Sequence, residues 1–321
     1  MSEATKVNLK KDQIELKKLF KEYIDECQFA RGLRLQTIIS YKAVFHHFST
    51  IMPEAVYVRS LTREIMIEFF KRIKERERVV GKNTKKVGLE DSTIKTYGNK
   101  LNAFFVWLIQ KELISKNPLE NIKLRFPEYN DQRALKQEEV HKIISAITLK
   151  SKDPLVLKRD TMMISLLFFC GLRKGEFISL KIGDIDMAKK VLTVRAETSK
   201  SKRSRIMPMN DTLVLHMDEY LHERKRHAYK TEYLIVSSTE DKGLSIHGLK
   251  HWIKKLKEVS GVNFHLHRFR HTFACNCAKA NMSIIKIRDL MGHKSVRMTE
   301  VYLRSLNMED MRGDINKLSI M

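Results

Sequence analysis

The stretch His-Arg-Phe-Arg-His-Thr at positions 267–272 combines basic side chains with an apolar anchor and opens a helical pattern. His267 and Arg270 are three residues apart, so they share one helical face and can reach a single phosphate. Phe269 and Phe273, four residues apart, predict that the opposite side packs into a core. Taken alone, the stretch is also compatible with the start of an ordinary basic helix, so its neighbours decide its meaning.

A histidine and a tyrosine follow downstream at a defined spacing. Gly292 and His293 precede Tyr302 by ten and nine residues respectively. Ser295 and Thr299 are candidate caps for a short helix that carries Tyr302. The alternative interpretation of Tyr302 is a half-buried aromatic, which is the usual environment of a tyrosine.

A further arginine stands upstream, directly after an apolar helix. The order Gly171-Leu172-Arg173-Lys174-Gly175-Glu176 lets the backbone turn at the glycine and presents Arg173. By itself this segment is equally well explained by Gly171 as a helix C-cap and Arg173 as a solvated charge.

The segment Ser-Lys-Ser-Lys-Arg-Ser-Arg at 199–205 separates two β-like runs and predicts a basic hairpin tip. Lys200 is its candidate for chemistry, with Lys202 as the alternative. Lys202, Arg203 and Arg205 are candidate DNA contacts. A charged turn that only touches the phosphate backbone also explains most of these residues.

Breaking a DNA strand without losing the energy of its bond requires a specific set of groups. A side-chain nucleophile must hold the phosphate covalently. Arginines neutralise the charge on the non-bridging oxygens, because the planar guanidinium pairs with two oxygens at once. A proton must leave the nucleophile and another must reach the leaving 5′ oxygen. The segments described above supply each of these residue types.

In their order and spacing, these segments resemble the tyrosine recombinase family, whose catalytic pattern runs Arg, Lys, His-x-x-Arg, His or Trp, and Tyr. The nine-residue step from His293 to Tyr302 also matches the family. The helical N-terminal third, which ends in Asn-Pro-Leu-Glu-Asn-Ile at 117–122, looks like the family's core-binding domain. Arg268 and Phe269 depart from the family's usual acid and Leu, and the hairpin lacks the glycine that usually follows the lysine.

The resemblance implies a site-specific recombinase that works without cofactor or metal. The tyrosine would attack the scissile phosphate, leaving a 3′-phosphotyrosine and a free 5′ hydroxyl, and strand exchange would pass through a Holliday junction. The two arginines would clamp the phosphate, Lys200 would protonate the leaving oxygen, His267 would act as base and His293 would bond the phosphate. The implied catalytic residues are Arg173, Lys200, His267, Arg270, His293 and Tyr302, with Glu176 as a brace.

Pattern and resemblance together predict a mainly α protein with a small β-sheet, in which a helical core-binding domain and a catalytic domain form a clamp round DNA. We expect an N-terminal tail at 1–12, a SAM-like DNA-binding domain at 13–122, a linker at 123–134, a catalytic domain at 135–305 and a C-terminal tail at 306–321. The apolar residues of that tail indicate docking, either in the same chain or on a neighbouring subunit of a homo-tetramer.

Hydrophobic periodicity predicts the individual elements. Helices are expected at 13–29, at 35–51, from Thr62, and from Asp91 or Ser92 to the residues before Pro118. The segment 76–90, basic and interrupted by Gly81 and Gly88, is expected to be a loop. The second half is expected to hold helices at 136–148, 159–170, 211–229 and throughout 266–321, with β-like runs at 191–195, 206–209 and 234–236.

The charge balance favours a polyanionic partner. Lys and Arg number 61 against 38 Asp and Glu, a net charge of +23. Double-stranded DNA fits this excess, and an anionic membrane or an acidic protein is the alternative. Lys82, Lys85 and Lys86 in the expected loop are candidate DNA contacts, unless the loop is only solvated. The longest apolar run, 162–172, is too short to span a bilayer, and the four cysteines do not suggest a disulfide scaffold, so we expect a cytoplasmic protein without a membrane partner.

Three other functions compete with this interpretation. A type IB topoisomerase shares the tyrosine chemistry and relaxes DNA without a partner site. A non-catalytic DNA-binding relative would keep the fold alone, and a basic helical protein for RNA or membranes would leave the motif spacing to chance. The sequence leaves open the target DNA, accessory proteins, and whether the role is resolution, integration, excision or inversion.

Overall fold

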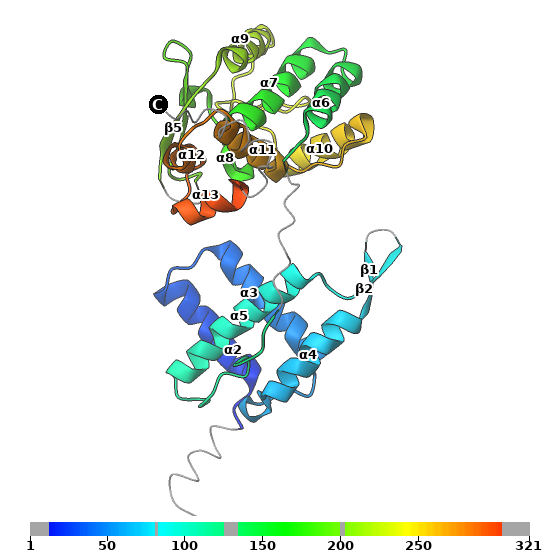
Figure 1. Cartoon of the computed structure of the whole chain (residues 1–321), viewed down its shortest axis with the longest axis vertical. Helices are drawn as coiled ribbons and strands as arrows, with labels where there is room; N and C mark the ends of the chain where they lie inside the picture. Colours follow the sequence, from blue (N-terminus) through cyan, green and yellow to red (C-terminus); the bar gives the residue numbers. More distant parts are fainter. Residues whose placement is uncertain (1–12, 81–82, 125–133, 200–202, 304–321) are drawn as a thin grey trace, which may run out of the picture. The chain divides into compact units, whose positions relative to one another are not determined.

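The computed structural model describes residues 13–80, 83–124, 134–199 and 203–303, with only the backbone described at positions 80, 150 and 301–303. The chain divides into two compact units, Met1–Tyr129 and Asn130–Met321 (Figure 1). Both units are mainly helical, and each has its own hydrophobic core. The predicted fold class, mainly α with small sheets, is confirmed.

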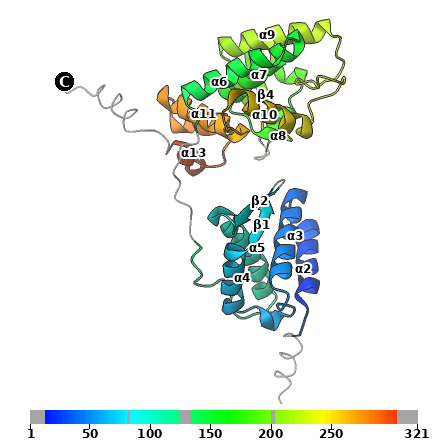
Figure 2. The same ribbon diagram turned by 90° about the vertical axis from the view of Figure 1, so that its right-hand side faces the viewer.

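Helices form the body of the first unit (Figure 2). Thr62 caps α4, because its side chain accepts a hydrogen bond from the Ile65 N–H at 3.3 Å. Aromatic rings fill the centre: Phe20 stacks on Phe45 with ring centroids 3.8 Å apart, and Phe104 packs edge-on against both. The elements are α2 (Leu16–Asp25), the π-helical turn Glu26–Ala30, α3 (Leu35–Ile51), α4 (Arg63–Glu75) and α5 (Asp91–Gln110).

The prediction of a loop at 76–90 is wrong, because this segment contains an antiparallel β-hairpin. Strands β1 (Glu77–Val80) and β2 (Thr84–Val87) pair with Arg78 opposite Lys86. All four β2 residues are exposed, so no apolar alternation marks the strand in the sequence. Gly88 closes the hairpin at φ +67°, and a Cβ there would lie 2.3 Å from the Lys74 carbonyl oxygen, so only glycine fits.

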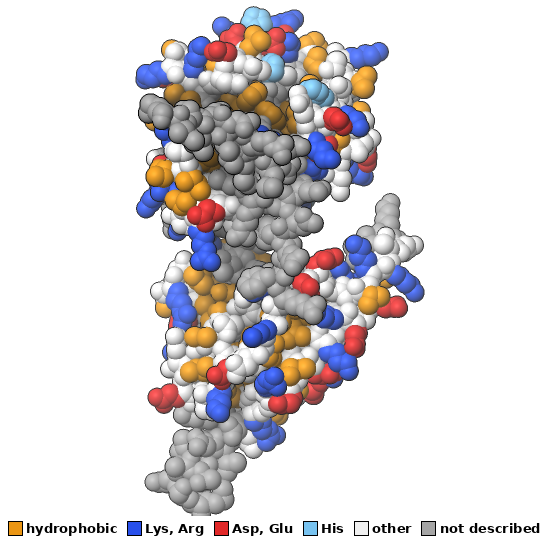
Figure 3. Space-filling model, viewed as in Figure 1, with side chains coloured by type: hydrophobic (Ala, Val, Ile, Leu, Met, Phe, Trp, Pro, Cys, Tyr) orange, Lys and Arg blue, Asp and Glu red, His pale blue; other side chains and the backbone are white. Residues whose placement is uncertain are grey.

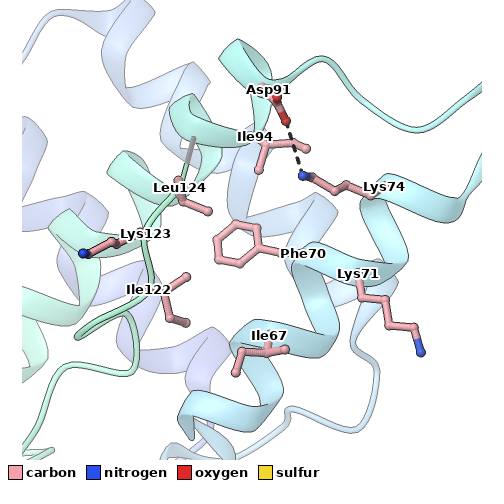
Figure 4. A pocket seen from close by; sticks show the side chains of 9 residues that line it. All are labelled: Ile67, Phe70, Lys71, Lys74, Asp91, Ile94, Ile122, Lys123 and Leu124. Carbon is pink, nitrogen blue, oxygen red and sulfur yellow. Dashed lines mark ion pairs between the residues drawn. The ribbon is translucent and has the colours of Figure 1, made fainter. Parts of the chain in front are cut away.

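The end of the first unit folds back over α4 and α5. Leu124 packs closely against Gly98: a Cβ added to Gly98 would lie 2.3 Å from Cδ1 of Leu124. A cavity of 260 Å³ lies between these segments, with Phe70 pointing toward its centre and the Lys74–Asp91 ion pair of 3.4 Å at its rim (Figure 4). The packed part of this unit therefore continues to Leu124.

The second unit surrounds the buried helix α7. This helix packs against α9 and α11, and it begins five residues earlier than predicted because Asp153 accepts from the Val156 N–H at 3.0 Å and Pro154 occupies its first turn. The elements are α6 (Gln137–Lys150), α7 (Pro154–Cys170), α8 (Lys174–Ile178), β3 (Ile185–Asp186), β4 (Val191–Val194), β5 (Arg205–Pro208), α9 (Asp211–Arg226), α10 (Ile246–Ser260), α11 (Leu266–Lys279), α12 (Ile284–Met291) and α13 (Val296–Leu303).

Several predicted elements of this unit need correction. The β-like runs at 191–195 and 206–209 are confirmed as β4 and β5 of a sheet ordered β3-β4-β5. The run at 234–236 is no regular strand, and the 211–229 helix ends at Arg226. The stretch after 266 is helical as predicted, as far as it is described, and the positive φ of Asn281 and Gly292 divides it into α11, α12 and α13. Helices α8 and α10 were not predicted.

Candidate active site

Three arginine side chains meet at the C-terminal turn of α12. The last carbonyls of a helix have no partner within the helix, and the helix dipole makes this end negative, so cations are stabilised there. Each arginine bonds a different one of three consecutive carbonyls. The donors and acceptors are Arg205 Nε to Leu290 O at 2.7 Å, Arg270 Nη2 to Met291 O, and Arg173 Nη2 to Gly292 O at 3.1 Å.

Gly292 makes this convergence possible. It ends α12 in the left-handed conformation, with φ +62°. A Cβ at this position would lie 2.9 Å from Nη1 of Arg205 and 3.3 Å from its Cδ. Glycine is therefore required both by the backbone angle and by the guanidinium that passes over it.

Glu176 lies beneath the arginines with its side chain fully buried. Its Oε2 accepts from the Arg173 backbone N–H at 3.0 Å and from Arg205 Nη2 at 2.8 Å. Its Oε1 accepts from Arg173 Nη1 at 2.9 Å and from Arg205 Nη1 at 3.1 Å. Burial alone would raise the pKa of this carboxyl, but the bonds from both arginines outweigh it and lower the pKa to about 2. Glu176 is thus an ionised brace.

Arg270 is held from within the protein, since only 1% of it is exposed. Its Nη1 donates to the carbonyl of Gly171 at 2.7 Å, and its Nη2 also meets Nε2 of His293 at 3.0 Å. Gly171 ends α7 at φ +53°, and the Phe273 ring lies 2.5 Å from where its Cβ would be. Gly171 is therefore an ordinary C-cap and also a support for Arg270.

His293 is buried between Arg270 and Thr299. Its Nδ1 lies 3.0 Å from the hydroxyl of Thr299, which is completely buried within α13. Burial, and then the charges of Arg270, Arg173 and Arg205, lower the pKa of His293 to about 3. Because arginine has no acceptor, the Arg270 contact makes Nε2 the acceptor, so the proton of the neutral ring lies on Nδ1 and faces Thr299. Thr299 thus bonds the ring and is no helix cap.

The remaining candidates are distributed as follows. His267 is exposed in the first turn of α11, with its ring 5.1 Å from that of His271. The backbone of α13 includes Tyr302, whose side chain is outside the described residues. Lys82, Lys200 and Lys202 also lie outside them. Lys85, Lys86 and Arg203 are exposed.

Arg205 was predicted to be an exposed DNA contact, and its buried position does not fit that role. Its side chain is only 8% exposed and points inward to Glu176. This orientation agrees with β5, because Met207, two residues along the strand, is buried, and strand residues two apart share a face. Ile206 and Met207 are both apolar and only Met207 is buried, so the sequence alone does not show which face turns inward. Of the predicted site residues, the structure brings together Arg173, Glu176, Arg270 and His293, and it adds Arg205 and Thr299 to them.

Comparison with known proteins gives the family. Residues 133–309 match the phage integrase family, and residues 15–124 match the phage integrase SAM-like domain. The chain belongs to the phage integrase family. The predicted resemblance to tyrosine recombinases is confirmed.

Relatives of this integrase-family protein match over most of its length. Tyrosine recombinase XerC of Psychromonas ingrahamii is 25% identical over 291 residues, covering 89% of this chain and 91% of the relative. Tyrosine recombinase XerD of Listeria innocua is 25% identical over 280 residues, covering 85% and 89%. The Tn1549 transposon integrase in complex with transposon right end DNA has the same fold, with a TM-score of 0.74 at 19% identity, covering 96% of this chain and 100% of that one.

Two absences hold for the described part of this integrase-family chain. None of its described helices is long and apolar enough to cross a membrane. Within the same residues, no group of three or more His, Cys, Asp or Glu side chains is placed to hold a metal ion.

Proposed function

We propose that the protein is a site-specific recombinase that cleaves and rejoins double-stranded DNA through a 3′-phosphotyrosine at Tyr302 and a Holliday junction. One observation carries the proposal: Arg173, Arg270 and His293 come from separate segments and meet at one helix end, directly before the helix that includes Tyr302. Such a convergence of guanidinium groups suits a phosphate whose charge rises in the transition state. The family relationship supports the same chemistry.

Each residue takes a role that follows from its chemistry. Arg173 and Arg270 bind the non-bridging oxygens, and 21% of the Arg173 side chain is open to solvent, so a phosphate can approach it. His293 bonds the same phosphate, and His267, exposed on α11, assists removal of the tyrosine proton. Lys200 protonates the 5′ oxygen, with Lys202 as the alternative. No step in this scheme requires a metal or a cofactor.

DNA is the partner that the solved relatives support. The structure of XerH site-specific recombinase contains its difH substrate; it matches with a TM-score of 0.68 at 20% identity and covers 91% of this chain and 82% of that one. The structure of lambda integrase is a dimer bound to a core site; it matches with a TM-score of 0.73 at 20% identity and covers 100% of this chain and 85% of that one. For this chain we propose a homo-tetramer on two sites, with 306–321 docking on a neighbouring subunit and accessory proteins selecting the sites. Residues 13–122 would bind DNA beside the catalytic domain at 135–305, with the contacts Lys82, Lys85, Lys86, Lys202 and Arg203.

Covalent capture tests this function directly. The protein is mixed with fragmented DNA from its source and quenched with denaturant, and the DNA that stays attached is sequenced. We expect capture at a few discrete sites. Tyr302→Phe should abolish capture but keep DNA binding, whereas Tyr233→Phe, a change on a partly exposed tyrosine, should leave both intact. Capture that persists in Tyr302→Phe would place the nucleophile elsewhere, and capture scattered over all sequences would indicate a topoisomerase.

The arginines have a separate test. Arg173→Ala and Arg270→Ala should each lower the cleavage rate by at least about a hundredfold, because each removes charge from the transition state. DNA affinity should fall much less, since most of it comes from phosphate contacts elsewhere. Equal losses in cleavage and binding would make these residues simple DNA contacts.

A further inference from the structure

Glu176 has two arginine partners, and they hold it in different ways. Arg205 forms two parallel bonds, one to each carboxylate oxygen, at 3.1 and 2.8 Å. This bidentate geometry is the strongest that an arginine and a carboxylate can form. The Arg173 guanidinium makes a single bond to the carboxylate, at 2.9 Å, and gives its other Nη to Gly292. Arg205 is therefore the closer partner.

Arg205 is also fixed in place. Its Nε donates to Leu290 O at 2.7 Å, so each of its three nitrogens has a partner within the protein. The guanidinium lies against Gly292, where even a Cβ would come within 2.9 Å of it. Its side chain is 8% exposed, compared with 21% for Arg173. Of the two arginines, Arg173 is the one that can turn to a phosphate.

A buried carboxylate beside a phosphate-binding arginine creates an electrostatic conflict. Glu176 attracts the Arg173 guanidinium, and its negative charge repels a phosphate that approaches the same group. A second cation bound permanently to Glu176 weakens both effects, because it neutralises most of the carboxylate's charge. We infer that Arg205 is a positioning residue for cleavage, which acts as the permanent counter-ion of Glu176 and so keeps the charge of Arg173 available to the scissile phosphate. This inference rests on the proposed function, in which Arg173 binds that phosphate.

The inference predicts a specific pattern of defects. Without Arg205, the carboxylate pairs with Arg173 alone and withholds it from the phosphate, so cleavage slows while DNA binding persists. Removing the charge of Glu176 as well takes away the competitor, so the double variant recovers. If Arg205 only packed against its neighbours, replacing Glu176 as well would not restore the cleavage rate.

The experiment uses the full chain and a duplex that carries a cleavage site recovered by covalent capture. Single-turnover rates of covalent attachment are measured at saturating protein for wild type, Arg205→Met, Arg205→Lys, Glu176→Gln and the Glu176→Gln/Arg205→Met double variant. Arg226→Met is the matched control, because this arginine is 64% exposed on α9 and pairs only with Glu223 among the described contacts. DNA affinity across a salt series and thermal unfolding are recorded for each protein.

We expect Arg205→Met to lower the attachment rate by at least about tenfold with unchanged affinity and salt dependence, since residues in one ion-pair network are strongly coupled. The double variant should attach at least about threefold faster than Arg205→Met. Arg205→Lys, which keeps the charge, should recover part of the rate even if Arg205→Met unfolds.

Other outcomes overturn the inference. Weaker DNA binding with a smaller salt dependence, at an unchanged saturated rate, would make Arg205 a DNA contact. A double variant as slow as the product of the two single defects would mean that Arg205 and Glu176 act independently. An Arg205→Lys protein as slow as Arg205→Met would exclude a role for the charge. If wild type attaches to no DNA, the proposed function fails as well, whereas attachment with additive defects removes the counter-ion role alone.

Discussion

At the scale of single residues, His293 shows how burial selects one form of a side chain. Arg270 can only donate, so its contact at 3.0 Å fixes Nε2 as an acceptor and places the ring proton on Nδ1. The hydroxyl oxygen of Thr299 accepts a hydrogen bond from this Nδ1–H, with 3.0 Å between Nδ1 and Oγ1. A threonine hydroxyl can donate as well as accept, so it remains a partner if the ring proton moves to Nε2 to meet a phosphate. Isosteric removal of this hydroxyl is therefore informative.

Thr299→Val should slow cleavage by about tenfold, because it leaves a buried imidazole N–H without its acceptor, at a cost of about 1–3 kcal/mol. Thr299→Ser keeps the hydroxyl and should retain most of the rate. Single-turnover attachment measures both variants. A wild-type rate in Thr299→Val would show that the contact does not matter for cleavage.

The protonation of His293 can be followed by NMR. Its pKa is lowered to about 3, so the folded protein keeps this ring neutral where a free histidine would gain a proton. The ring ¹⁵N shifts of His293 should therefore stay constant between about pH 5 and pH 8, the range in which a free histidine changes its charge. The assignment is confirmed by loss of the signal in His293→Gln. A midpoint near 6.5 would contradict the buried, arginine-facing ring.

At the scale of elements, regular periodicity predicted most of the long helices. The exception is α10, whose buried Leu249, Trp252 and Leu256 follow a helical period that the sequence prediction missed. Short or exposed elements could not be predicted. The stripes of α2, α3 and α5 predicted the first unit, and Phe269 and Phe273 correctly predicted the buried side of α11. Helix α8 has five residues, too few for a period, and β1–β2 is solvated, so neither carries a pattern of apolar residues. The residues of the proposed catalytic set could be selected from the sequence, but the inward orientation of Arg205 depends on Glu176, a contact between distant parts of the sequence.

The hairpin β1–β2 should act as a DNA-binding element of the first unit. Lys85 and Lys86 are exposed on β2, and Lys and Arg side chains are spread over the face of the protein shown in Figure 3. Replacing both lysines by glutamine should weaken binding to a generic duplex, and the slope of log affinity against log salt should fall by about 2. The matched control is the exposed pair Lys17 and Lys18 on α2. Equal losses in both double variants would assign the effect to net charge alone.

At the scale of the whole molecule, the two hydrophobic cores share no residue. The buried core of the first unit ends at Leu108, and that of the second begins at Leu135. Each core also holds one of the two tryptophans, Trp107 in the first and Trp252 in the second. Intrinsic fluorescence can therefore follow the two units one at a time.

Trp252→Phe and Trp107→Phe variants should report different unfolding midpoints in urea, the former for the first unit and the latter for the second. Two cores with no residue in common among those described can unfold in separate transitions, so we expect the whole chain to depart from two-state unfolding. Circular dichroism of the same variants controls for destabilisation by the substitutions themselves. Coincident midpoints in both variants and in wild type would show that the two units unfold together.

The division into two cores also has a consequence for how the sequence evolves. Phe104 belongs to the core of the first unit and Phe177 to that of the second, so a substitution that loosens the packing around one leaves the packing partners of the other unchanged. Each unit can therefore accumulate changes at its own pace. If the first unit selects the DNA sequence, a lineage can change that preference by substitutions in this unit alone, while the arginine cluster at the end of α12 is inherited unchanged.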